Sequence, residues 1–380
     1  MSEPAAEGAA TDRRRSARRR VRRARAGVAL VVGAGLTLGA CTDSGSGDSG
    51  SSGSGSSGSG DPATPSTAAP SPEWERIDAA LAELAPEVGF LAARVTPDGT
   101  CEPVHEVEAT TARPIGSQFK LFVLGALADE IAAGRHSWDQ TLTVLQEEKS
   151  VGNQEGSLQF VDPGTVVTLE EAATLMISIS DNTAADLLVD LVGQDAIQAR
   201  LREWVDDPAA NDPFLTTKQM FLLHYATGLA DRYLATPPAE RAAFLAAEVD
   251  PLLIGEIASG YSSAPRYVDT IEWFATPLDL CRTFAGLQQL AEEPALAPLP
   301  SVLSKEVIGI GLDRDEWPTL WYKGGSEPGV LTLGWLGVDR DGATYVVEGM
   351  LMDPDAVLAE DAITDLRALA EDAFGLLRAG

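Results

Sequence analysis

The stretch RPIGSQFKLFVLGALADEIAAG, residues 113–134, largely decides the fold and also points to chemistry. Its apolar pattern predicts a long helix from Arg113 to Arg135. Ser117 and Lys120 lie one turn apart near its start, so their side chains share a face. Apolar neighbours lower the pKa of Lys120 and favour a neutral, basic amine. An N-cap serine beside a lysine reaching for solvent is the structural alternative, although Lys120 is the only one of five lysines with a serine three positions before it.

A second motif, Ser180-Asp181-Asn182, lies within VTLEEAATLMISISDNTAADLLVDLVG, residues 167–193, where the pattern predicts two helical stretches. Thr168 and Glu171 form a capping box for the first of them. The Ser180 hydroxyl can pass a proton to a leaving group, and the Asn182 amide can contact a substrate. A polar interruption between two helices is the alternative, because Ser, Asp and Asn all favour helix caps.

The third motif, Lys323-Gly324-Gly325-Ser326, follows a predicted strand at 320–323. Glycines such as Gly325 allow a substrate backbone to approach the strand edge. Lys323 supplies a cation for a carboxylate, and the Ser326 N–H can complete an oxyanion hole. A glycine-rich hairpin turn is the structural alternative.

The order of the three motifs resembles that of class A β-lactamases and penicillin-binding proteins, with Ser-Asp-Asn 63 residues after the Ser-x-x-Lys serine. The resemblance covers about residues 75–380. Four longer runs resemble the actinobacterial serine hydrolases related to the clavulanic-acid-pathway cephalosporin esterase. They are ISISDNTAADLL (177–188), NDPFLTTKQMFLL (211–223), IEWFATPLDLCRTFAGL (271–287) and WPTLWYKGGSEPGVLTL (317–333).

This resemblance implies a role for each motif residue. Ser117 would be the acylated nucleophile, Lys120 its base and Ser180 a proton shuttle. Lys323 would position Ser180 and the substrate carboxylate. The backbone N–H groups of Ser117 and Ser326 would form the oxyanion hole.

Two departures from the class A pattern bear on activity. Those enzymes carry a Glu-x-x-x-Asn loop whose Glu activates the deacylating water, and no Asn in this chain's folded part has Glu four residues before it. The segment 183–275 is also longer than is usual there, and Glu272 is the candidate substitute, with a helix-entry acid as the alternative. Gly324 stands where the family has Thr or Ser. Losing that hydroxyl weakens penicillin binding by about ten- to a hundred-fold.

The N-terminal region reads as an export signal. A basic run from Arg13 to Arg25 precedes an apolar stretch at 26–38, which is too short for a typical membrane span. Leu-Gly-Ala-Cys at 38–41 then resembles a bacterial lipobox, so residues 1–40 are expected to be a lipoprotein signal peptide and Cys41 the lipidated residue. An ordinary signal peptide or a short anchor is the alternative, and Sec or twin-arginine export stays open.

A tether follows Cys41. Residues 42–60 are almost only Ser, Gly and Asp, and residues 61–72 add four prolines. This composition cannot form a core. We therefore expect residues 41–72 to link a membrane lipid to a folded hydrolase domain at 73–380, outside the cytoplasmic membrane.

Charge restricts the choice of partners. The chain of 380 residues has a net charge of −29, and from Cys41 onward it carries 19 bases against 54 acids. Such a surface repels phosphates and argues against nucleic-acid binding. We expect a monomer that takes a small-molecule substrate and uses no metal or other cofactor.

The element pattern predicts an α/β (α+β) fold. Strands are expected at 88–95 and 101–108 near the start, and at 320–323, 330–338 and 343–352 near the end. Helices are expected at 73–84 and 356–377, and mainly helical sequence between. The prediction is one antiparallel sheet built from both chain ends and flanked by helices, with a separate all-helical lobe.

Two further features have structural alternatives. Cys101 falls on a predicted strand and Cys281 in the helical region, so we expect two separate thiols even though an oxidising exterior permits a disulfide. Trp317, Trp321 and Tyr322 flank the Lys-Gly-Gly strand, where they line the cleft or pack in the core.

Together these features predict a serine hydrolase that forms an acyl-enzyme on β-lactams or related esters and amides, with slow turnover of penicillins. Activity of the β-lactamase or cephalosporin-esterase type is expected. A non-catalytic lipoprotein that binds β-lactams or cell-wall fragments, and a D,D-peptidase, are the alternatives. Three scattered histidines and no Gly-x-Ser-x-Gly elbow in the folded part argue against a Ser-His-Asp hydrolase.

Overall fold

The computed structural model describes residues 71–152, 156–257, 262–305 and 310–379. The expected signal peptide, Cys41 and most of the tether lie outside the described residues, so these expectations stay predictions. In the part of the chain that is described, no helix is both long enough and apolar enough to cross a membrane.

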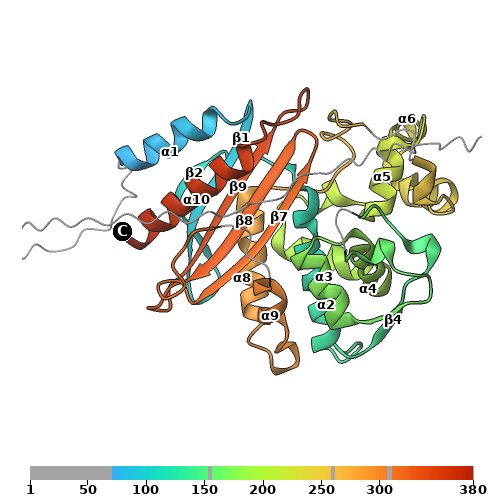
Figure 1. Ribbon diagram of the computed structural model, residues 1–380, viewed down its shortest axis with the longest axis horizontal. Coiled ribbons are helices and arrows are strands. Elements are labelled where there is room, and N and C mark those ends of the chain that lie inside the picture. Colours follow the sequence, from blue (N-terminus) through green and yellow to red (C-terminus); the bar gives the residue numbers. More distant parts are fainter. Residues whose placement is uncertain (1–70, 153–155, 258–261, 306–309, 380) are drawn as a thin grey trace, which may run out of the picture. The chain divides into compact units, whose positions relative to one another are not determined.

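A five-stranded antiparallel sheet forms the centre of the domain (Figure 1). Its strands, in the order of the sheet, are β2 (Cys101–Val107), β1 (Glu87–Val95), β9 (Thr344–Met352), β8 (Val330–Val338) and β7 (Thr319–Glu327). The first two strands of the sequence pair with the last three, which confirms the prediction of one sheet built from both chain ends. Strand β7 is the edge strand nearest the helical lobe.

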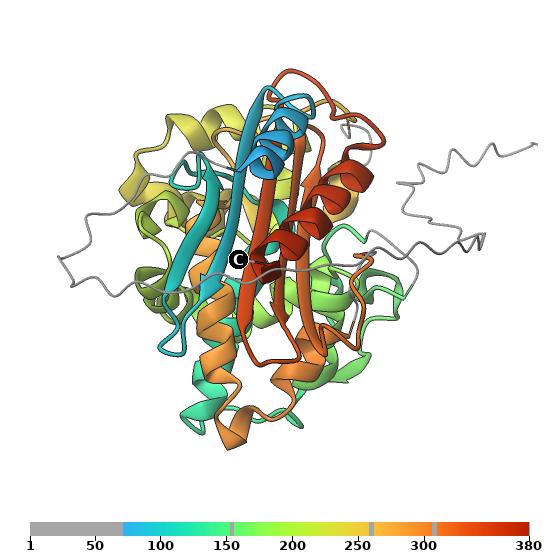
Figure 2. The ribbon, with the colours of Figure 1, turned by 90° about the vertical axis from the view of Figure 1, so that its left-hand side faces the viewer.

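Two helices from opposite ends of the chain cover one face of this sheet, α1 (Pro72–Ala82) and α10 (Ala362–Ala379) (Figure 2). Their apolar stripes pack on the sheet, with Trp74, Ile77 and Leu81 of α1 buried. The other face packs against helices from the middle of the chain.

The middle of the chain forms the helical lobe and its connections. Its helices are α2 (Lys120–Ala132), α3 (Leu169–Ser178), α4 (Asn182–Trp204), α5 (Thr217–Tyr225), α6 (Leu229–Ala235), α7 (Arg241–Phe244), α8 (Pro277–Leu290) and α9 (Leu299–Ser304). Two small sheets pair β3 (Arg113–Pro114) with β6 (Phe274–Ala275) and β4 (Thr141–Thr143) with β5 (Val166–Thr168). The predicted capping box exists, because Thr168 Oγ1 accepts from the Glu171 N–H at 3.1 Å.

Several element boundaries differ from expectation, among them the start of α10 at Ala362 instead of residue 356, and two of them bear on the site. The helix predicted from Arg113 begins only at Lys120, because Pro114 belongs to β3 and residues 116–119 form a 3₁₀ turn, η1. Strand β7 continues through both glycines to Glu327, because Ser326 pairs with Leu331 of β8. The motif glycines therefore lie on a strand edge, and the turn is confined to Pro328 and Gly329.

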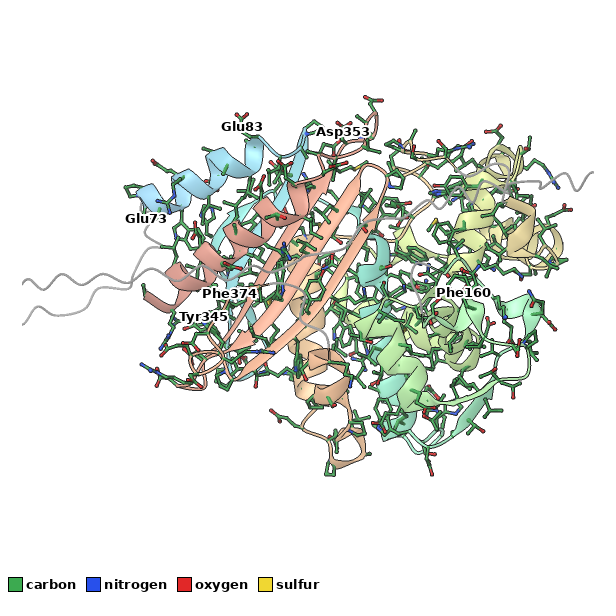
Figure 3. All side chains as sticks on the ribbon, viewed as in Figure 1. Glu73, Glu83, Phe160, Tyr345, Asp353 and Phe374 are labelled. Atoms are coloured by element: carbon green, nitrogen blue, oxygen red, sulfur yellow. A yellow bond between two sulfur atoms is a disulfide. The ribbon has the colours of Figure 1, made fainter. Side chains whose placement is uncertain are left out.

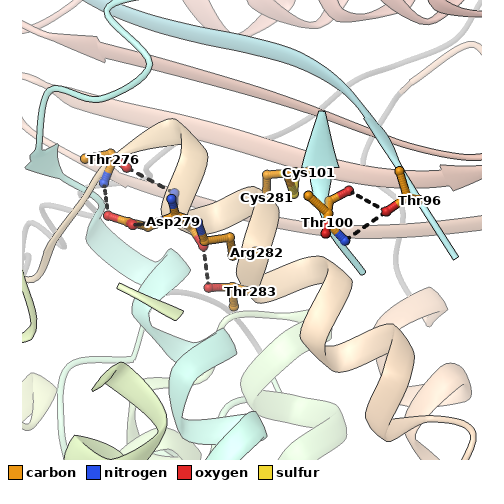
Figure 4. The surroundings of a disulfide bond; sticks show 8 residues. All are labelled: Thr96, Thr100, Cys101, Thr276, Asp279, Cys281, Arg282 and Thr283. Carbon is orange, nitrogen blue, oxygen red and sulfur yellow. Dashed lines mark hydrogen bonds and ion pairs between the residues drawn. A yellow bond between two sulfur atoms is a disulfide. The ribbon is translucent and has the colours of Figure 1, made fainter. Parts of the chain in front are cut away.

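The expectation of two separate thiols is wrong. Cys101 and Cys281 form a disulfide, with a Cα–Cα distance of 6.3 Å (Figure 4). The error lies in the placement of α8, which packs on β1, β2 and β9 of the sheet. Cys281 thereby faces the first residue of β2.

The aromatic residues before the Lys-Gly-Gly motif are buried in the core. Trp317 makes edge-to-face contacts with Phe374 of α10 at 5.0 Å and with Tyr345 of β9 at 5.7 Å between ring centroids. Figure 3 labels these two partners. Tyr322 lies against Trp335 on the same face of the sheet. Core packing, one of the two alternatives, therefore describes both residues.

The disulfide closes a loop of 180 residues between distant parts of the chain. We expect its removal in a Cys101→Ser/Cys281→Ser variant to lower the free energy of unfolding by about 2–4 kcal/mol. Chemical denaturation of both proteins measures the difference. A folded, non-reduced protein that takes up two equivalents of maleimide would contradict the pairing.

Candidate active site

The η1–α2 segment carries Ser117 and Lys120 into the domain. Helix α2 is apolar on nearly all sides, and residues 121–128 are buried, so it forms the central helix of the lobe. Because Lys120 is its first residue, its side chain is drawn inside with it and is 0% exposed. Ser117, one turn earlier, keeps partial access to solvent.

The Lys120 amine lies at the meeting point of the first two motifs. Its Nζ is 3.2 Å from Ser117 Oγ and 3.0 Å from Ser180 Oγ. It also donates to the Ser180 carbonyl oxygen at 2.7 Å and to Asn182 Oδ1 at 2.6 Å. One amine thus contacts both motif hydroxyls and two further oxygens.

These contacts suit a neutral amine. A carbonyl and an amide oxygen can only accept, so the two shortest contacts take two N–H protons of Lys120. The remaining lone pair of a neutral amine can then accept a proton from Ser117 or Ser180. Lys120 is therefore placed to deprotonate Ser117.

Burial favours the neutral form of the Lys120 amine. Removal from water lowers the pKa of Lys120 to about 7, although the negative charges of Asp181 and Asp186 act to raise it. About half of the amine is thus neutral near pH 7. Lysine in water would be almost wholly protonated at that pH.

The link between α3 and α4 aims the second motif at this amine. Ser180 has a left-handed backbone with φ of 56°, which is strained for a non-glycine residue. Asp181 holds the turn, because its carboxylate accepts from the Ala184 N–H at 3.1 Å and the Leu158 N–H at 2.6 Å. Asn182 Nδ2 donates to the Val151 carbonyl at 2.9 Å, which turns Oδ1 toward Lys120.

Lys323 approaches Ser180 from the sheet. Its Nζ donates to Ser180 Oγ at 3.1 Å and to the Gly324 carbonyl at 2.7 Å. Burial, and then the nearby Lys120, lower the pKa of Lys323 well below its ordinary value. The Ser180 hydroxyl therefore lies between two amines, which suits a group that relays protons.

The two predicted oxyanion amides are close together. A Cβ on Gly325 would collide with the Ile115 carbonyl and lie 2.6 Å from the Ser117 nitrogen. On the other side, a Cβ on Gly116 would lie 3.2 Å from the Ser326 nitrogen. Only a residue without a side chain permits this approach at position 325, which explains Gly325.

Position 324 has a physical reason to be glycine. A Cβ there would collide with the Tyr322 hydroxyl and lie 3.1 Å from Leu333 Cδ2. The phenol thus fills the space that a threonine side chain needs. The absence of a hydroxyl at position 324 therefore goes together with the presence of tyrosine at position 322.

Glu272 is buried, with 4% of its surface exposed, and its Oε2 accepts from the Trp273 N–H at 3.0 Å. Burial, and then the Glu327 carboxyl group, raise its pKa well above the ordinary value. Glu272 lies just before β6, which pairs with β3 at the start of the segment that carries Ser117. Its water-activating role stays a prediction.

Sequence reasoning missed Gln118 and Glu348. Gln118 Nε2 donates to the Lys323 carbonyl at 3.0 Å and to Glu348 Oε1 at 2.9 Å, which ties η1 to β7 and β9. Burial raises the pKa of Glu348 well above its ordinary value. A glutamate inside the apolar strand TYVVEGMLM was the available signal.

The buried amine makes the reaction of Ser117 depend on pH. Because the pKa of Lys120 is about 7, the base is lost as pH falls through that value, and we expect acylation by a fluorophosphonate to fall about tenfold per pH unit below it. Rapid-mixing kinetics measure the rate of acylation, and Lys120→Met should lower this rate by about 10²–10⁴-fold.

The control for this measurement is Lys218→Met, because Lys218 is also buried but its Nζ donates to the carbonyls of Glu147 and Asp250. In this variant the acylation rate should still rise near pH 7. The role of Lys120 would be contradicted if the acylation rate of the unaltered protein rose only near pH 10. It would also be contradicted if the rise near pH 7 persisted in Lys120→Met.

Comparisons with known proteins give a family match for part of the chain and a shared fold. Residues 74–240 match a family described as the β-lactamase enzyme family, a range that includes Ser117, Lys120 and the Ser180 motif but ends before Lys323. No curated protein matches the chain.

Solved structures show the same fold at low identity. A β-lactamase from Sphaerobacter thermophilus DSM 20745 is 22% identical over 80% of this chain and 98% of that one, with a TM-score of 0.53. PBP-A is 16% identical over 82% and 97%, also with a TM-score of 0.53. An ancestral class A β-lactamase is 18% identical over 80% and 99%, with a TM-score of 0.52. The chain therefore has the fold of β-lactamases and penicillin-binding proteins.

Proposed function

We propose that this protein is a serine hydrolase that forms an acyl-enzyme on β-lactams or related esters and amides. The observation that carries the proposal is the Lys120 amine, which is buried and 3.2 Å from Ser117 Oγ. Burying an amine costs free energy, which favours a chemical role for this base at a serine hydroxyl. The match of residues 74–240 to the β-lactamase enzyme family supports the same class.

In the proposed acylation, Ser117 Oγ attacks the substrate carbonyl carbon and gives its proton to the neutral Lys120 amine. The Ser117 and Ser326 N–H groups stabilise the negative oxygen that forms. Ser180 donates its proton to the leaving nitrogen or oxygen as the carbonyl bond to it breaks, and regains a proton from Lys120 or Lys323. The products are an acyl ester on Ser117 and a protonated leaving group.

Deacylation is the slow step in this proposal. In the described part of the chain, no carboxylate is hydrogen-bonded to Ser117 or Lys120, and the raised pKa of Glu272 favours a protonated acid that cannot take a proton from water. A point variant of PBP-A has been solved as an acyl-enzyme complex with penicillin G. This favours a second candidate, a protein that binds β-lactams covalently and releases them slowly or not at all.

We also propose that the domain works outside the cytoplasmic membrane, held there by a lipid on Cys41. The Cys101–Cys281 disulfide supports an oxidising location. The lipobox-like sequence supports the anchor. Mass spectrometry of the membrane fraction, which would find a diacylglyceryl group on Cys41, tests this part.

The nucleophile is tested by Ser117→Ala. We expect a fluorescent penicillin or fluorophosphonate to label the unaltered domain and to leave this variant unlabelled, because the substitution removes the hydroxyl that attacks the carbonyl carbon. Ser304→Ala is the control, since Ser304 is exposed and its Oγ donates to the Pro300 carbonyl. Labelling that survives Ser117→Ala would refute the proposal.

Turnover separates the candidate functions. The domain is incubated with nitrocefin, a cephalosporin acetate ester and D-Ala-D-Ala peptides, and product and adduct are followed by mass spectrometry. Steady product release establishes a hydrolase and its substrate class. One stable adduct per chain establishes the covalent binder.

Position 324 provides a test of specificity. Gly324→Thr together with Tyr322→Phe restores a hydroxyl at the strand edge and removes the oxygen that blocks it. We expect penicillin acylation to become about ten- to a hundred-fold more efficient than in Tyr322→Phe alone. A folded double variant with unchanged acylation by penicillin would show that the missing hydroxyl does not limit binding.

A further inference from the structure

Two glutamates that the proposed reaction does not use lie against each other beside the nucleophile segment. Glu272 is 4% exposed, and the Glu327 side chain is 9% exposed. They come from different parts of the fold: Glu272 precedes β6, and Glu327 is the last residue of β7. Neither carboxyl group forms an ion pair with a lysine or arginine in the described part of the chain.

In the ranges that the structure describes, two carboxylate oxygens of this pair have no hydrogen-bond donor, and a proton held between the carboxyl groups would satisfy them. The Trp273 N–H satisfies Glu272 Oε2, whereas Glu272 Oε1 and Glu327 Oε1 are buried and accept from no donor among the described residues. Two adjacent carboxylates would repel in such a dry place, but a protonated Glu272 can donate to Glu327. Burial and the neighbouring carboxyl group raise the pKa of Glu272 well above its ordinary value, which favours the protonated form.

The pair joins the two segments that carry the oxyanion amides. On one side, the Gly116 N–H also faces the Glu272 carboxyl group. The Trp273 carbonyl accepts from the Ile115 N–H at 2.9 Å, so the residues around Glu272 hold the strand that leads to Ser117. On the other side, Glu327 directly follows Ser326.

We propose that Glu272 and Glu327 form a proton-dependent clasp that holds the Ser117 and Ser326 amides in register, and that Glu272 is thus a positioning residue of the oxyanion hole. The proposal rests on the proposed function for its catalytic consequence. When the clasp holds a proton, the two segments are joined by a carboxyl–carboxylate hydrogen bond. When the proton is lost, two carboxylates face each other and the segments separate.

Among the described residues, the other titratable group that faces the pair is His224 on α5, and Arg266 lies near that histidine. His224 Nε2 is 2.7 Å from the Ile271 carbonyl, so this nitrogen carries the hydrogen. Its Nδ1 is 3.9 Å from Glu327 Oε2, which is too long for a hydrogen bond. Burial lowers the pKa of His224, so the neutral ring supplies no cation to replace the shared proton.

The sign of the pH effect follows from the raised pKa. The unfolded chain loses the Glu272 proton near pH 4.5, while the folded chain keeps it to higher pH. Between these values the folded state binds more protons, so this group makes the protein less stable as pH rises. Loss of the proton in the folded state should also slow acylation and produce an alkaline decline.

The test is Glu272→Gln. Its amide can donate to Glu327 and accept from Trp273 without a titratable proton. We expect acylation of Ser117 at pH 7 to stay within about threefold of the unaltered protein, and the alkaline decline to move up by at least one pH unit. Asp279→Asn, which removes another buried acid with a raised pKa at the start of α8, should leave that decline in place.

A decline unchanged in Glu272→Gln, or acylation more than tenfold slower at pH 7 in the folded variant, would overturn the clasp. Thermal melting provides a readout that needs no reaction: the stability of Glu272→Gln relative to the unaltered protein should rise with pH above about 4.5. If the unaltered protein is never acylated, the proposed function fails, and a constant difference in melting temperature would still refute the clasp.

Discussion

The burial of one lysine amine is the constraint on which the site depends. Lys120 is the first residue of a helix that is apolar on nearly all sides, and within the described ranges its amine has only the oxygens of Ser117, Ser180 and Asn182 as hydrogen-bond partners. A dry setting of this kind disfavours the ammonium form. The same packing that stabilises the lobe therefore produces a base beside a serine hydroxyl.

The sheet supplies the second half of the site. Strand β7 brings Lys323 to Ser180 and Gly325 to the backbone of Ser117, and both contacts require that β7 be straight through the glycines. Gln118 of η1 adds a hydrogen bond to the Lys323 carbonyl. The site is thus assembled where the central helix of the lobe meets the sheet edge.

Sequence reasoning succeeded where the decisive spacing is local. Ser117 and Lys120 are one turn apart, so their proximity follows from helix geometry alone, and the strands of both chain ends follow from alternation and turns. The disulfide could not be predicted, because it depends on α8 packing against the sheet, a long-range contact. The proximity of Glu272 and Glu327 was missed for the same reason, and because the expected strand ended at residue 323 whereas β7 continues to Glu327.

The most direct test of this account is the titration of Lys120 itself. Lysine labelled with ¹³C at Cε gives at most five signals in this protein, so the one lost in Lys120→Met is assigned by comparison. The account predicts that this signal titrates near pH 7. A signal that titrates near pH 10, as for a lysine in water, would show that the amine is charged at neutral pH and cannot activate Ser117.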